Sequence, residues 1–264
     1  MKIIAIANQK GGVAKTTTAI NLAAALAEHG RRILLIDMDP QGNASTGLGI
    51  DPDARARTVY DLLLGDSTVA DVTTETATAG IWIIPSTTDL SSSDIELQGV
   101  NRRGHLLRDR LRHDTEAKAG FDYCLIDCPP SLNLLTVNAL VAADSVLVPL
   151  QSEFFALEGL SHLLLTIREI RQSANPGLRI EGVVLTMHDQ RNNLSQQVEN
   201  DARETLGEVI YQTVIPRNVR LSEAPSHAVP IITYDSGSTG ARAYRALANE
   251  FLENNEEQRK RAQA

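Results

Sequence analysis

The sequence predicts an α/β protein in which a mostly parallel, twisted sheet is flanked by helices on both faces. The first observation behind this prediction is that short apolar runs of strand length alternate with helical patterns along most of the chain, which is the order that β-α-β units produce. The second is that 42% of the 264 residues are hydrophobic, enough for a sizeable core. No second domain is required, and we expect residues 1–264 to form one domain.

The expected strands are apolar runs bounded by turn residues or acids. They lie at residues 2–7, 32–37, 80–85, 123–127, 145–149, 180–186 and 209–214. The expected helices carry apolar residues at helical spacing, and Gly30 ends the first of them. They lie at residues 16–29, 106–112, 132–142, 157–173, 194–206 and 241–254.

Two stretches depart from this alternation. Apart from the expected strand at 80–85, residues 42–94 are less regular and show one short helical pattern at 59–64. We expect them to form an insertion beside the functional site rather than a linker. Residues 253–264 are charged and lack an apolar stripe, so we expect a polar, frayed helix end there rather than a binding element.

Charge and cysteine content exclude several classes of protein. The formal net charge of −8 argues against a protein that coats nucleic acid with its whole surface, and leaves a local basic face as the open alternative. The two cysteines, Cys124 and Cys128, are too few for a disulfide framework or a four-ligand metal site, and they fit a reducing cytoplasm. No apolar run approaches the roughly 20 residues that span a bilayer. We therefore expect a soluble, cytoplasmic protein.

Residues 9–17, with the sequence QKGGVAKTT, lie between the first apolar run and the first helical pattern. A strand, a glycine turn and a helix N-terminus together present unpaired N–H groups and the positive end of a helix dipole, which an anion can fill. Lys15 adds a full charge, and Thr16 adds the hydroxyl that commonly binds Mg²⁺ in such loops. We prefer this phosphate site to an ordinary glycine turn. The expected phosphate contacts are Gly11, Gly12, Val13, Ala14, Lys15, Thr16 and Thr17.

The loop differs from the common G-x-x-x-x-G-K-[ST] form because Gln9 and Ala14 occupy its glycine positions. It matches K-G-G-x-x-K-T, with Lys10 as a second lysine, and resembles the deviant Walker A box of the P-loop ATPases of the ParA/MinD class. The resemblance implies an ATP and Mg²⁺ site, and a homodimer in which Lys10 reaches the phosphates of the partner's sandwiched nucleotide. Ala14 departs from the family's usual glycine, which costs about 1 kcal/mol or more if φ must be positive. We still expect a working site.

Two acidic motifs follow expected strands, at the sheet edge where ligands bind in parallel α/β proteins. The resemblance gives Asp39 the role of orienting the attacking water, and gives Asp37 a supporting role linked to Mg²⁺. Residues 121–130 form an apolar strand that ends in Asp127 before a proline pair, similar to a Walker B motif with the family's D-x-P-P. Asp127 is then expected to hold Mg²⁺ through water. A plain turn capped by acids is the alternative for the first motif.

Two later stretches complete the resemblance. The strand at 180–186 leads to Met187, near where the family places adenine. Residues 215–226, IPRNVRLSEAPS, resemble the signature of chromosomal ParA (Soj) proteins, which implies base contacts from Pro216 and Asn218. The same loops supply the arginines expected to bind DNA phosphates, sequence-independently and with strong salt dependence. They are Arg191, Arg217 and Arg220.

The resemblance implies a weak ATPase that dimerises with Mg²⁺-ATP, binds DNA non-specifically at the nucleoid and partitions a chromosome or plasmid with a stimulating ParB-type partner. One alternative is a related ATPase that positions another cargo, such as a chemoreceptor cluster or the division site. A MinD-like membrane regulator is less favoured, because the C-terminus lacks an amphipathic basic helix and no stable membrane association is expected. The first strand has no helix-turn-helix before it, so a self-repressing plasmid type is not expected either.

Overall fold

The computed structural model describes residues 1–153 and 156–263. Its strands form one sheet in the order β3-β4-β2-β5-β1-β6-β7, parallel throughout except for the antiparallel pair β3 and β4. The bounds are β1 Lys2–Ile6, β2 Ile33–Asp37, β3 Thr74–Glu75, β4 Ile81–Ile84, β5 Tyr123–Asp127, β6 Ser145–Gln151 and β7 Arg179–Thr186. The predicted fold class is confirmed, and the two-residue edge strand β3 is an addition to it.

Helices connect the strands and cover both faces of the sheet. Their bounds are α1 Lys15–Glu28, α2 Asn43–Gly47, α3 Val59–Leu64, α4 Val69–Val72, α5 Ser93–Glu96, α6 Leu106–His113, α7 Thr115–Gly120, α8 Leu134–Ala142, α9 Ala156–Ser173, α10 Asn193–Leu206, α11 Val219–Glu223, α12 Ile231–Tyr234 and α13 Thr239–Gln263. The helical pattern at 59–64 is confirmed as α3. Within the described ranges, none of the helices combines the length and apolarity needed to cross a bilayer.

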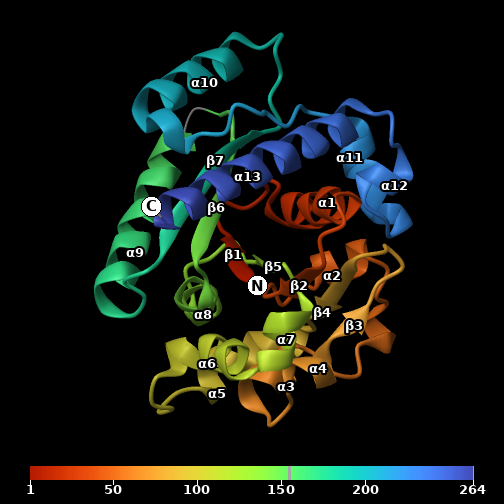
Figure 1. Ribbon diagram of the computed structural model, residues 1–264, viewed down its shortest axis with the longest axis vertical. Helices are drawn as coiled ribbons and strands as arrows, with labels where there is room; N and C mark the ends of the chain where they lie inside the picture. The colour runs from red at the N-terminus through yellow and green to blue at the C-terminus, as the bar shows by residue number, and fades with distance from the viewer. Residues whose placement is uncertain (154–155, 264) are drawn as a thin grey trace.

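The core lies in two layers, one on each face of the sheet. Alternate side chains of β1 belong to different layers. Ile4 and Ile6 pack in the layer with α1 and α13, whereas Ile3 and Ala5 pack in the layer with α6, α8 and α9. Figure 1 shows the same division, with α1, α11, α12 and α13 on one side of the sheet and α3, α4, α6 and α8 on the other. Cys124 and Cys128 are buried in the second layer, as the interpretation of both as core residues requires.

The strand expected at residues 209–214 is wrong. Only one isolated bridge, between Val183 and Ile210, joins this segment to β7. Further along, the N–H groups of Gln212 and Thr213 donate to the Glu250 carboxylate on α13, at 2.6 and 2.9 Å. The Glu250 side chain therefore takes two donors that a strand would offer to its neighbour. Tyr211 N–H still donates to Val183 O and Ile215 N–H to Leu185 O, both at 2.8 Å, but these bonds do not form a continuous ladder. At the start of the segment, Val209 belongs to a short 3₁₀ helix, Gly207–Val209.

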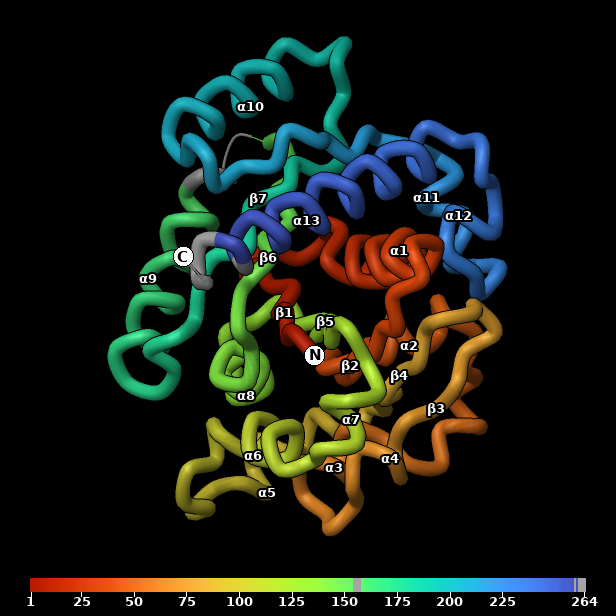
Figure 2. Tube along the Cα trace, viewed as in Figure 1, coloured from red at the N-terminus to blue at the C-terminus, as the bar shows by residue number. Residues whose placement is uncertain are grey.

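Helix α13 is longer than expected and contacts the sheet near its far end. It continues to Gln263, through residues 253–263, for which the sequence analysis expects a frayed, polar end. Ala264 lies outside the described residues. Asn255 in this stretch is buried, and its amide donates to the carboxylate of Glu181 on β7. The same carboxylate accepts from Lys2 of β1 and Ser145 of β6. Figure 2 follows α13 along the side of the sheet that α1 also covers.

Candidate functional site

The loop between β1 and α1 forms a cradle of backbone N–H groups. Gly12 and Ala14 both have positive φ, 74° and 66°, and Ala14 is the N-cap residue of α1. The first hydrogen bond of the helix runs from Thr18 N–H to Ala14 O. The N–H groups of Lys15, Thr16 and Thr17 precede that bond, so they have no partner within the helix and are free for an anion.

Side chains from neighbouring strands hold this loop in place. Asn8 donates to the carbonyl of Pro149 in β6 at 2.7 Å and accepts from Lys10 N–H at 3.0 Å. Thr186, the last residue of β7, donates its hydroxyl to the carbonyl of Val13 at 3.1 Å. Sequence reasoning missed both Asn8 and Thr186. The available signal was position, since each is a polar residue at the carboxyl end of an apolar run, within two residues of a predicted site residue.

Asp127 lies beneath the cradle, where three strands end level. The sheet register pairs it with Ile6 of β1 and with Asp37 of β2. Both carboxylate oxygens of Asp127 are buried without a hydrogen-bond partner of normal geometry among the described residues. Burial, and then the charge of Asp37, raises the pKa of Asp127 well above its usual value, while the Thr16 side chain acts to lower it. Unpaired, buried carboxylate oxygens are a donor set that a hydrated divalent cation would satisfy.

Asp37 and Asp39 have different surroundings. Asp37 is fully buried and accepts hydrogen bonds from Ser45 N–H and Oγ at 2.8 and 2.7 Å. Burial raises the pKa of Asp37 to about 6, although these hydrogen bonds act to lower it. Asp39 accepts from Gln41 N–H and lines a cavity of about 300 Å³ together with Gly11, Gly12, Ala14, Lys15, Thr16, Thr17 and Met187. Asp37 therefore organises the loop, and Asp39 faces the space above the cradle.

A second cavity of about 530 Å³ adjoins the first, because Ala14, Thr17 and Met187 line both. Pro216 and Asn218 also line this cavity, together with apolar side chains from α11 and α13, among them Leu221 and Tyr244. The structure thus brings together the phosphate cradle and the residues expected to contact the base. A polar cradle beside a larger, partly apolar pocket has the form of a nucleotide site.

The two loop lysines point to different places. Lys15 is 7% exposed, and its Nζ donates to the carbonyl of Lys10 across the loop at 3.1 Å. Burial lowers the pKa of Lys15, and the charge of Asp127 opposes that change. Lys10 is not among the residues that line either cavity. Its side chain is exposed and pairs with Glu153 at 2.7 Å.

The three predicted DNA-binding arginines are exposed but do not form one cluster. Arg191 and Arg217 line a third cavity, of about 520 Å³, together with Pro216. Arg191 also pairs with Asp189 at 3.2 Å. Arg220, on α11, pairs instead with Glu223 at 2.9 Å and with Asp235 at 3.5 Å.

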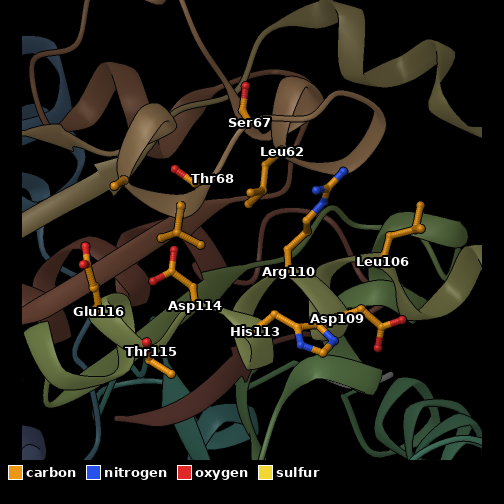
Figure 3. Close-up of a pocket in the computed structure, with 12 residues that line it drawn as sticks. Leu62, Ser67, Thr68, Leu106, Asp109, Arg110, His113, Asp114, Thr115 and Glu116 are labelled. Carbon is orange, nitrogen blue, oxygen red and sulfur yellow. The ribbon is translucent and has the colours of Figure 1, made fainter.

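A cavity of about 610 Å³ lies away from all of these groups, between α3 and α4 on one side and α6 and α7 on the other. Figure 3 shows its labelled side chains, with Asp109, Arg110 and His113 of α6 on one side of the cavity and Glu116 on the other. None of the predicted site residues lines it. Its volume alone therefore does not make it the functional site.

Comparison with known proteins agrees with this geometry. A family model described as an AAA domain matches residues 1–180. The chain is 56% identical to the chromosome partitioning protein ParA of Caulobacter vibrioides over 96% of its length and 94% of the relative. It is 52% identical to the sporulation initiation inhibitor protein Soj of Bacillus subtilis, over 96% of this chain and 99% of that one.

Solved structures with the same fold include a Mycobacterium smegmatis protein described as cobyrinic acid a,c-diamide synthase with bound ADP and magnesium. It has a TM-score of 0.82 and 38% identity, covering 95% of this chain and 94% of that one. The cell division ATPase MinD of Pyrococcus furiosus has a TM-score of 0.79 and 28% identity, covering 96% and 98%. Together with the cradle above Asp127, these likenesses show that the chain belongs to the ParA/Soj family of chromosome-partitioning P-loop ATPases.

Proposed function

We propose that this protein hydrolyses ATP with Mg²⁺ as part of a cycle of dimerisation and non-specific DNA binding that partitions DNA. The observation that carries the proposal is the meeting of the α1 N-terminus, Lys15 and Thr16 with the unpaired carboxylate of Asp127. The nucleotides and magnesium in related structures support the same ligands here. The names of the most similar relatives favour DNA partitioning over the positioning of another cargo.

Hydrolysis of ATP requires positioning and charge neutralisation more than covalent chemistry. The N–H groups of the cradle and Lys15 would bind the phosphate oxygens. Thr16 and Asp127 would hold Mg²⁺, directly or through water, and the ion would neutralise charge on the phosphates. Asp39 faces the same cavity as the cradle and would orient the attacking water. Asp37 would support the cation site indirectly, since its carboxylate is bonded to Ser45.

Lys10 gives the reason for proposing a dimer. Its exposed ammonium pairs with Glu153 outside the cavities that surround Lys15. An exposed pair of this kind contributes at most about 1 kcal/mol, so Lys10 can leave it at little cost. We infer that Lys10 then reaches the phosphates bound by a second copy, with two nucleotides held between the chains. Loss of the terminal phosphate would remove those contacts and favour separation.

DNA binding would follow from dimerisation. Each copy has a net charge of −8, and its expected DNA contacts are Arg191 and Arg217 in loops and Arg220 on α11. Pairing two copies doubles the phosphates that these arginines can neutralise. A ParB-type partner that accelerates hydrolysis would then release the DNA and complete the cycle.

Analytical ultracentrifugation combined with a phosphate-release assay tests the proposal. The unsubstituted chain should sediment as a monomer alone and as a dimer with ATP and Mg²⁺. Lys10→Ala should bind nucleotide but remain monomeric and inactive. Lys15→Ala should weaken nucleotide binding by about 100-fold or more, because the phosphates lose the charge of the buried Lys15 ammonium. Normal ATP-dependent dimerisation of Lys10→Ala would show that Lys10 does not act across an interface.

A further inference from the structure

Arg55 is a buried cation in the segment that the sequence leaves irregular, between α2 and α3. The residue is 8% exposed. The guanidinium donates to the carbonyl of Ile50 through Nε at 3.1 Å and through Nη2 at 2.7 Å. It also donates to the hydroxyl of Thr46 at 2.7 Å and to the carbonyl of Ser86 at 2.9 Å. All of these acceptors are neutral oxygens rather than carboxylates.

Burying a guanidinium group without a direct ion pair is unfavourable unless its donors are used. Burial accordingly lowers the pKa of Arg55, and the more distant charges of Asp37 and Asp51 act to raise it. The fork of N–H groups on an arginine can bridge several separate carbonyls at once. Arg55 uses this fork to join Ser86, two residues beyond the end of β4, to the segment that contains α2.

This junction lies directly against the turn that carries Asp39. A Cβ added to Gly42 would lie 2.2 Å from Arg55 Nη1, so the guanidinium packs on the bare backbone of Gly42. Gly42 N–H donates to Asp39 O at 2.9 Å. In addition, the Thr46 hydroxyl that accepts from Arg55 donates to Gly42 O at 3.1 Å. A hydrogen bond therefore joins Asp39 and Gly42, the first and last residues of the turn, and Arg55 packs against Gly42.

Ser86 receives a second connection from the same loop. Its N–H donates to Ser45 Oγ at 3.1 Å, and Ser45 in turn donates to the Asp37 carboxylate. The backbone of Ser86 is thus bonded on both sides, through its N–H to Ser45 and through its carbonyl to Arg55. Both connections join the loop that carries Asp39 to the segment after β4.

We propose that Arg55 is a positioning residue for hydrolysis, which clamps the loop of residues 39–50 to the end of β4 and so fixes where Asp39 holds the attacking water. The inference rests on the proposed role of Asp39 in ATP hydrolysis. Arg55 itself is not expected to contact the nucleotide, because it does not line the cradle or the base cavity.

The test is to compare Arg55→Met with Arg57→Met in the full chain. Arg57 lies two residues further on, is exposed and pairs with Asp71 at 3.6 Å, so it controls for loss of an arginine in this segment. We expect Arg55→Met to lower kcat by about tenfold to 100-fold, because small displacements of a reacting group have effects of that size. The Kd for ATP should change by less than about threefold, since ground-state contacts are kept. Arg57→Met should match the unsubstituted chain in both.

Two further variants keep the inference testable if Arg55→Met does not fold. Thr46→Val removes only the exposed hydroxyl that joins Arg55 to Gly42, and should lower kcat about threefold or more with an unchanged melting temperature. Arg55→Lys keeps the charge but loses the fork, so it should remain impaired. Hydrogen exchange at Ser45 and Thr46 should be faster in all three variants than in Arg57→Met.

The outcomes separate the two proposals. If the unsubstituted chain does not hydrolyse ATP, the proposed function fails, while hydrogen exchange still reports whether Arg55 clamps the loop. If the unsubstituted chain is active and folded Arg55→Met or Thr46→Val keeps its kcat, the positioning role is wrong and the ATPase assignment stands. A lower melting temperature with unchanged kcat would show that Arg55 is structural only.

Discussion

The nucleotide site and the arginine-bearing surface of this protein are built in opposite ways. At the nucleotide site, Asp37 and Asp127 are fully buried and backbone N–H groups form the cradle. On the arginine surface, the side chains of Arg191 and Arg220 are 92% and 55% exposed, and both pair with acids of their own chain. The first region is fixed before a ligand arrives, whereas the second consists of charges in water.

This difference determines what each region can recognise. Fixed N–H groups and carboxylates select a ligand by its geometry. Exposed arginines select by charge alone, with an affinity that falls as salt is added. Loss of a charged side chain from the first region should therefore abolish ligand binding or a chemical step, and loss of one from the second should change an affinity by degrees.

Asp39→Ala should have the largest effect, because it removes the carboxylate that faces the cavity above the cradle. We expect kcat for ATP hydrolysis to fall by about 100-fold or more, the usual contribution of a group that orients or deprotonates a nucleophile. ATP binding should persist, so the ATP-bound dimer should accumulate on DNA. Phosphate release and sedimentation measure the two effects, and turnover at the parental rate would move the water-orienting role to another residue.

Arg220→Glu and Glu223→Gln should change DNA affinity in opposite directions. The first reverses a charge, and in a dimer the loss of two phosphate contacts should reduce the salt slope by roughly 0.9 for each. The second removes the partner that pairs with Arg220 at 2.9 Å, and should raise affinity by about twofold to fivefold. Mobility-shift titrations with ATP at several salt concentrations measure both.

The control for this pair is Arg112→Glu, which makes the same charge change at an exposed position on α6, on the opposite side of the sheet from α11 (Figure 1). It should leave DNA affinity close to that of the unsubstituted chain. Equal losses in Arg112→Glu and Arg220→Glu would mean that net charge, rather than a defined surface, governs binding.

Ala14→Gly should have the smallest effect, and it concerns the nucleotide site. Ala14 has φ 66°, a left-handed conformation that costs a residue with a Cβ about 1–2 kcal/mol. Glycine relieves this cost but loses more entropy on folding, so we expect a gain of about 0.5–1 kcal/mol in the free energy of unfolding. The Kd for ATP should change little, because the backbone already has the conformation that glycine would adopt.

Thermal unfolding measures this gain, with two comparisons that fix its origin. Ala228, with φ 56°, should respond to glycine in the same direction as Ala14. Ala246, exposed in the interior of α13, should respond in the opposite direction, because glycine destabilises a helix interior. A loss of stability in Ala14→Gly would show that the loop does not strain the alanine.

Sequence patterns predict those parts of the molecule whose structure is determined by residues close together along the chain. The apolar runs of β1, β2 and β5 predict where the cradle, Asp37 and Asp127 lie, because each stands at or just beyond the carboxyl end of its own strand. The clamp at Arg55 could not be predicted, since its acceptors on Thr46, Ile50 and Ser86 become neighbours only in the fold. The same reason explains the wrong strand at 209–214, where the Glu250 carboxylate from α13 replaces a strand partner.

The carboxylate of Glu181 has a consequence for how the chain can be cut or extended. It joins Lys2 at one end of the chain to Asn255 near the other, so the two ends belong to one cooperative unit rather than to independent tails. A truncation that removes Asn255 should leave a buried carboxylate with one donor fewer and lower the melting temperature, because under-satisfied buried charges destabilise. A truncation just beyond Asn255 should not, and the difference between these two shortened chains measures how firmly the last helix closes the fold.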